Sequence, residues 1–97
     1  MHAKHTPGPW EFDEFNEISC VENSYPVARV PFASGHLRGP ARAEAMAGIR
    51  ANLRLISAAP DLLDALQMAK HIVAREGTDE QMQQVFAAIE KATGEQA

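Results

Sequence analysis

The stretch PARAEAMAGIRANLRLISAAP, residues 40–60, decides the fold of this 97-residue chain. Its large apolar residues recur at steps of three and four, which predicts an amphipathic helix over residues 40–58: Met46, Ile49, Leu53 and Ile56. Leu55 falls on nearly the opposite side of this helix, so a second apolar contact is expected there. Pro60 disfavours helix at the residue before it and suits the first turn of a new helix, so one helix should end and another begin here.

Two further helices are expected downstream of Pro60. The second carries its apolar stripe through Leu62, Leu66, Ala69 and Val73 and should close at Gly77. Thr78 and Gln81 have the spacing of a capping box, which places the start of the third helix at Asp79. Gly94 is a natural helix stop. These two helices should pair as an antiparallel hairpin.

Upstream of residue 40 the apolar period changes to that of half-buried strands. Three short segments alternate apolar and polar side chains within residues 10–32: Trp10 and Phe12; Ile18 and Cys20; Ala28, Val30 and Phe32. Polar breaks at 13–16 and 22–26 separate them, and Pro26 and Pro31 restrict the third to an edge or a short length. The predicted fold is therefore α+β, with a small antiparallel sheet of two or three strands followed by three helices.

Length and composition predict one folded domain over residues 1–97. Hydrophobic residues make up 45% and charged residues 23%, which is ordinary globular usage. We expect a flexible N-terminal segment over residues 1–8, the sheet over 10–32 and the helical part over 40–94. The chain has no apolar run near the roughly 18 residues that cross a bilayer, and its N-terminus lacks the apolar stretch of a signal peptide. The expected location is the cytoplasm, without membrane partners.

Positive charge is concentrated in the middle of an acidic chain. The net charge is −4, which argues against general nucleic-acid binding. Residues 38–54 nevertheless hold four arginines against a single acid, Glu44. Because arginines near a helix N-terminus attract phosphate, we predict that these residues bind a phosphate-bearing ligand, with Trp10 or Tyr25 stacking on it: Arg38, Arg42, Arg50 and Arg54. Arg50 and Arg54, one helical turn apart, form the strongest predicted pair.

Each of these residues also has a structural interpretation. The arginines can form a solvated face or pair with acids such as Glu44 and Asp61. Trp10, flanked by Pro9 and Phe12, is typical of a core anchor. The two interpretations predict different effects of substitution, on stability in one case and on ligand affinity in the other.

Catalytic and metal sites are not expected. The four histidines lack cysteine or acidic partners at metal-site spacing: His2, His5, His36 and His71. Cys20 alternates with apolar residues and is typical of a small buried hydrophobe. Ser34 and His36 lack the strand-to-helix glycine turn of a hydrolase and an acid to orient the histidine. We therefore expect a non-enzymatic protein without cofactors.

Three blocks of sequence carry a family resemblance. HTPGPW at residues 5–10, ANLRLISAAPDLLDAL at 51–66 and AIEKATG at 88–94 together resemble a family of small phage and prophage proteins. The commoner form of the middle block has alanine at the positions of Leu53 and Ser57, so the packing around that helix can differ here. The resemblance brings no established catalytic residue.

The resemblance implies an accessory protein that acts against host defence in the host cytoplasm. The layout is similar to phage sponge proteins, which assemble as oligomers and sequester a nucleotide immune signal. The acidic charge is similar to that of anti-CRISPR inhibitors, which bind a host defence complex. We expect sequestration of a nucleotide-type signal by a homo-oligomer, with inhibition of a host defence protein as the alternative. A small regulatory protein is a second alternative, although no basic recognition helix is present.

Overall fold

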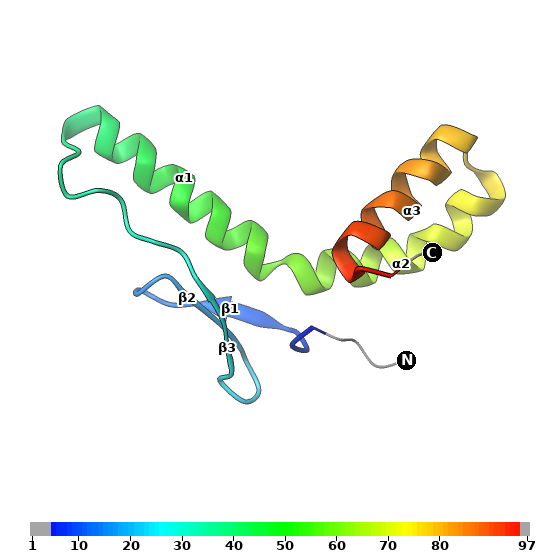
Figure 1. The fold of residues 1–97 in the computed structure, drawn as a ribbon, viewed down its shortest axis with the longest axis horizontal. Coiled ribbons are helices and arrows are strands. Elements are labelled where there is room, and N and C mark those ends of the chain that lie inside the picture. The colour runs from blue at the N-terminus through cyan, green and yellow to red at the C-terminus, as the bar shows by residue number, and fades with distance from the viewer. Residues whose placement is uncertain (1–4, 96–97) are drawn as a thin grey trace. The chain divides into compact units, whose positions relative to one another are not determined.

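The computed structural model describes residues 5–95 and has the predicted α+β architecture (Figure 1). Three antiparallel strands come first, in the spatial order β1-β2-β3. They are β1 (Trp10–Phe12), β2 (Glu17–Cys20) and β3 (Pro26–Arg29), and three helices follow them along the chain. The chain divides into two compact units, residues 6–59 with the sheet and the first helix, and a helical unit from residue 60 onward. The prediction of a single domain stays a prediction.

The strand register places the apolar residues of the sheet on one face. Trp10 lies opposite Cys20 and Phe12 opposite Ile18, so all four side chains share that face. Ile18 and Cys20 are fully buried there, as predicted for Cys20. On the other face, Arg29 donates a 2.9 Å hydrogen bond to the exposed carboxylate of Glu17 across the β2–β3 pair.

Side-chain hydrogen bonds shape the two turns. Asp13 Oδ1 accepts hydrogen bonds from the backbone N–H groups of Phe15 and Glu17, at 2.9 and 3.0 Å. Asn16 then adopts a positive φ of 61°, a conformation that asparagine tolerates better than most residues. In the β2–β3 turn, Asn23 Oδ1 accepts from Tyr25 N at 3.0 Å. Both polar breaks therefore form turns, as predicted.

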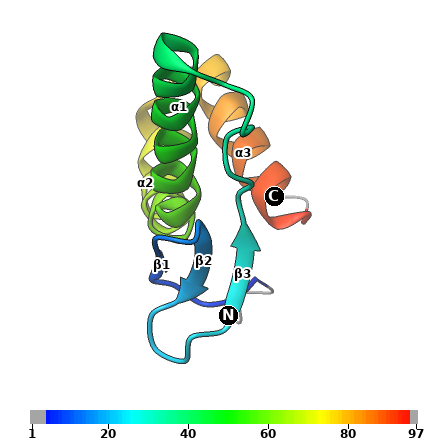
Figure 2. The same ribbon diagram turned by 90° about the vertical axis from the view of Figure 1, so that its left-hand side faces the viewer.

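The third strand is shorter than predicted. Val30 and Phe32 were expected to continue it, but β3 ends at Arg29. Val30 N still donates to the carbonyl oxygen of Asn16 at 3.0 Å, and Pro31, which has no N–H, follows at once and cannot extend the ladder. The chain beyond Pro31 runs back along the first helix toward its N-terminus (Figure 2).

The helix α1 (Gly39–Ser57) closes the core of the first unit. It contacts β1 and β2, and Figure 2 shows the strands close to its C-terminal end. Leu53 is only 2% exposed, whereas Leu55, two residues later on the other side, is 63% exposed. One side of α1 therefore packs within the unit, and the side that carries Leu55 lies open to solvent.

The second unit is the hairpin of α2 (Ala59–Glu76) and α3 (Asp79–Thr93). The predicted capping box is present, since Thr78 Oγ1 accepts from Gln81 N at 3.1 Å and Gln81 Oε1 accepts from Thr78 N at 3.0 Å. Gly77 is required in the connection, because a Cβ there would lie 2.7 Å from the carbonyl oxygen of Val73. Gly94 ends α3 with φ 74°, as expected of a glycine stop. Within residues 5–95, neither these helices nor α1 have the length and apolarity needed to span a bilayer.

Candidate ligand-binding site

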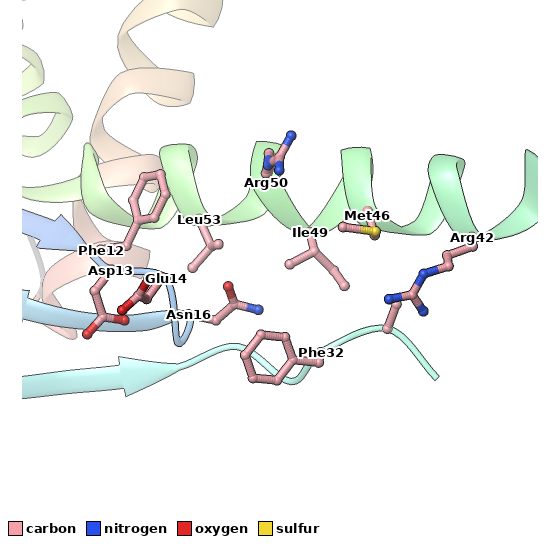
Figure 3. Close-up of a pocket in the computed structure, with 11 residues that line it drawn as sticks. Phe12, Asp13, Glu14, Asn16, Phe32, Arg42, Met46, Ile49, Arg50 and Leu53 are labelled. Atoms are coloured by element: carbon pink, nitrogen blue, oxygen red, sulfur yellow. The ribbon is translucent and has the colours of Figure 1, made fainter. Parts of the chain in front are cut away.

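A cavity of about 500 Å³ lies within the first unit, in the size range of small-molecule sites (Figure 3). Three segments enclose it: α1, the turn between β1 and β2, and the chain that follows β3. The lining residues are Phe12, Asp13, Glu14, Asn16, Phe32, Ala33, Arg42, Met46, Ile49, Arg50 and Leu53. All of them belong to residues 6–59, so the cavity is formed by one compact unit.

The helix α1 contributes one face to the cavity. At 3.6 residues per turn, Arg42, Met46, Ile49 and Leu53 fall within an arc of roughly 60°. Leu53 is the buried residue of this arc, and α1 contacts β1 and β2, so the side of α1 that packs within the unit is also the side that looks into the cavity. Arg50 lies at the margin of this arc, and Figure 3 draws its guanidinium above the helix, pointing away from Phe32.

Two aromatic side chains, Phe12 and Phe32, belong to the cavity lining, and Figure 3 places Phe12 beside α1 and Phe32 across from it. Phe12 comes from the end of β1, and Phe32 comes from the segment after β3, where it is 63% exposed. Figure 3 shows Phe32 across the cavity from Ile49. Exposed rings beside aliphatic side chains offer a flat apolar surface on which a planar ligand can stack.

The polar groups gather at the two ends of the cavity. Arg42 reaches in at one end, and Asp13, Glu14 and Asn16 lie at the other (Figure 3). Within residues 6–59, Arg42 and Arg50 form no ion pair with Glu44 or another acid, and the side chains of Glu14 and Asn16 make no hydrogen bond. Asp13 is different, because one of its carboxylate oxygens already holds the turn. The cavity therefore combines a cationic end, an apolar middle and an acceptor-rich end.

Of the six residues predicted to bind a ligand, the cavity brings together Arg42 and Arg50. Arg54 also lies on α1 but outside the lining, because it is rotated by roughly 100° from Leu53. Arg38 precedes α1, and its guanidinium donates hydrogen bonds to the carbonyl oxygens of Gly35 and Leu37. Tyr25, in the β2–β3 turn, is 64% exposed and away from the cavity lining.

Trp10 does not line the cavity. Its half-buried indole N–H donates to the carbonyl oxygens of Thr6 and Pro7, at 3.1 and 3.2 Å. These bonds hold part of the N-terminal segment that was expected to be flexible. The first four residues of that segment lie outside the described part of the chain.

The sequence interpretation missed the aromatic and acceptor groups of the cavity. Phe12 and Phe32 were assigned to the apolar face of strands, and Asp13, Glu14 and Asn16 to a polar break. A strand shows the same alternation of apolar and polar residues whether its apolar side chains fill a core or line an open cavity. The only local signal was the concentration of Asp, Glu and Asn beside Phe12.

Metal-ligating groups do not converge in the described residues. No three His, Cys, Asp or Glu side chains among residues 5–95 come together as a cation site. Of the histidines considered, His5, His36 and His71 are described, and His2 lies outside the described residues.

Comparison with known proteins places the chain in a family. No curated protein and no solved structure matches it significantly. A family model described as Salmonella phage P22 protein Y8K6 matches residues 1–96, nearly the full length. The resemblance to small phage proteins is thereby confirmed at the level of the family. The chain belongs to the family of Salmonella phage P22 protein Y8K6.

Proposed function

We propose that this phage protein is a non-enzymatic binding protein that sequesters a nucleotide-type signal of the host defence. The observation that carries the proposal is the cavity, in which Arg42, unpaired among the described residues, stands at one end of an aromatic and aliphatic surface. A nucleotide has the same division, with a flat base and a charged phosphate.

Two kinds of lining residue would contribute to the binding free energy of such a complex, the arginine and the phenylalanine rings. A guanidinium that has no partner in the free protein can bind a phosphate without breaking an existing ion pair. A base stacked on Phe12 or Phe32 would contribute roughly 1–3 kcal/mol, and stacking tolerates any base. Both contributions require the ligand to enter the cavity, whose volume of about 500 Å³ suits a mononucleotide-sized group.

Binding without conversion is proposed because of the side chains that face the cavity. Among the described residues, its lining holds no serine, cysteine, histidine or lysine to attack a phosphate, and its two carboxylates, Asp13 and Glu14, lie at the end away from Arg42, where the phosphate would bind. A protein that holds its ligand without converting it lowers the free concentration of that ligand in proportion to its own abundance. The proposed place of action is the host cytoplasm, without membrane or general nucleic-acid partners.

Self-association is the second part of the proposal. The open side of α1 exposes Leu55, and a symmetric contact between two copies would bury it. Such a contact would use the side of α1 away from the cavity, so a dimer and an occupied cavity are compatible.

The alternative function, inhibition of a host defence protein, is favoured by a different surface. Val21 and Tyr25 are exposed together in the β2–β3 turn, with the acidic Glu22 between them in sequence. Exposed aromatic and aliphatic groups on a projecting turn are typical of protein-binding anchors. Substitution of Tyr25 by Ala separates the two functions, since it should abolish protein capture and leave nucleotide binding intact.

The test is titration calorimetry with a panel of 5′-monophosphates and cyclic dinucleotides. Arg42→Ala should weaken binding by about 1.5–3 kcal/mol, the value of a charge-assisted hydrogen bond. Arg54→Ala is the matched control, because it removes the same charge from the same helix outside the cavity. Affinity should also fall as salt is added. Absence of binding across the panel, or equal losses in the two variants, would contradict the proposal.

A further inference from the structure

The two ends of the cavity differ in charge, and this difference restricts the orientation of a ligand. Arg42 lies at one end, and Glu14 with Asp13 lies at the other (Figure 3). An anionic group at the acidic end would be repelled by two carboxylates, whereas at the other end it would meet a guanidinium that has no ion pair within residues 6–59. A nucleotide in the cavity, as proposed above, must therefore direct its phosphate to Arg42 and its base to Glu14.

The acidic end accepts hydrogen bonds and offers few donors. Both carboxylate oxygens of Glu14 are without a hydrogen-bond partner within residues 6–59, while Asp13 holds two backbone N–H groups through Oδ1. An ionised carboxylate is an acceptor only. Asn16 adds a side-chain amide beside it, held there by a turn in which Asn16 has φ 61°. The base edge that faces Glu14 must therefore present N–H donors.

The four common bases differ in the donors of that edge. Guanine carries N1–H and the 2-amino group side by side, which match the two oxygens of one carboxylate. Adenine and cytosine place an amino group beside a ring nitrogen with a lone pair, which a carboxylate oxygen repels. Uracil has a single N–H between two carbonyl oxygens. Only guanine gives Glu14 two hydrogen bonds without an opposing acceptor.

We infer that the cavity selects a guanine nucleotide, with the base edge on Glu14, the ring between Phe32 and α1, and the phosphate on Arg42. This inference rests on the proposed function and adds the base to it. It also assigns a role to Glu14, because attraction to a phosphate does not explain a carboxylate in the cavity. The carboxylate acts by selecting the base, and its contribution is absent for ligands that lack the donors.

The experiment measures dissociation constants for the 5′-monophosphates of guanosine, inosine, adenosine and uridine. Inosine lacks only the 2-amino group, so we expect it to bind about 10-fold or more weakly than guanosine. Glu14→Gln should reduce the preference for guanosine over inosine to roughly threefold or less, because a neutral amide replaces one acceptor by a donor. Glu11→Gln is the matched control, since this exposed carboxylate lies outside the cavity lining and should leave the preference unchanged.

The outcomes separate this inference from the function on which it rests. Equal affinities for the four nucleotides, or a guanosine preference that survives in Glu14→Gln, would overturn base selection and leave nucleotide binding standing. Binding of none of the four would overturn both. Circular dichroism of each variant confirms that the comparison is made between folded proteins.

Discussion

Leu53→Ala should lower the free energy of unfolding of residues 6–59 by about 2–3 kcal/mol. The side chain is 2% exposed and belongs to α1, the helix that contacts β1 and β2. The substitution removes three buried carbon atoms, and at about 0.8 kcal/mol for each the lost transfer free energy is about 2.4 kcal/mol. Leu53 also lines the cavity, so truncation enlarges an existing space and does not create a sealed void. The cost should therefore fall at the lower end of the range of about 2–5 kcal/mol for leucine truncation in cores.

The assay is urea unfolding followed by tryptophan fluorescence. Trp10 is the single tryptophan of the chain and lies in the unit that contains Leu53, so its emission reports this unit. Leu55→Ala is the control, because it makes the same chemical change on the same helix at a side chain that is 63% exposed. Its effect should stay below about 1 kcal/mol at protein concentrations too low for self-association. Equal urea midpoints for the two variants would refute the assignment of Leu53 to the core.

Three further outcomes are expected. Trp10→Ala should lower the free energy of unfolding by about 2–3 kcal/mol, less than truncation of a fully buried tryptophan, because Trp10 is half-buried. Calorimetry on the folded fraction should find the nucleotide affinity unchanged. A variant that melts like the parent and loses affinity would make Trp10 a ligand contact. Thr78→Ala should cost about 1 kcal/mol by loss of the capping box, measured as a lower thermal midpoint of helical ellipticity. Light scattering at micromolar concentration should give a mass above the 10.6 kDa of one chain, and Leu55→Asp should restore the monomer mass; a parent protein already at 10.6 kDa would count against self-association.

The helices could be located from sequence because each of their ends has a local signal. Pro60 separates α1 from α2, Thr78 and Gln81 start α3, and Gly94 ends it, so the observed limits lie within about two residues of the predicted ones. Each signal depends on hydrogen bonds or steric limits between residues at most four apart. The end of β3 was less predictable, because the alternation of Val30 and Phe32 continued past the point at which Pro31 interrupts the ladder.

The candidate site was less predictable than the fold, because it depends on which side of α1 the sheet covers. Sequence spacing favoured Arg50 with Arg54, since residues four apart lie on the same side of a helix. That rule says that two arginines share a side of the helix, but it does not say whether this side faces the core. Once Leu53 is known to be the buried residue of α1, which contacts β1 and β2, the helical rotation of 100° per residue puts Arg42 in the cavity and Arg54 outside it. The apolar stripe through Met46, Ile49 and Leu53 already contained this information. Arg42 lies on that stripe, and a charged residue in line with an apolar one is the signal by which a cavity with a cationic end could have been expected.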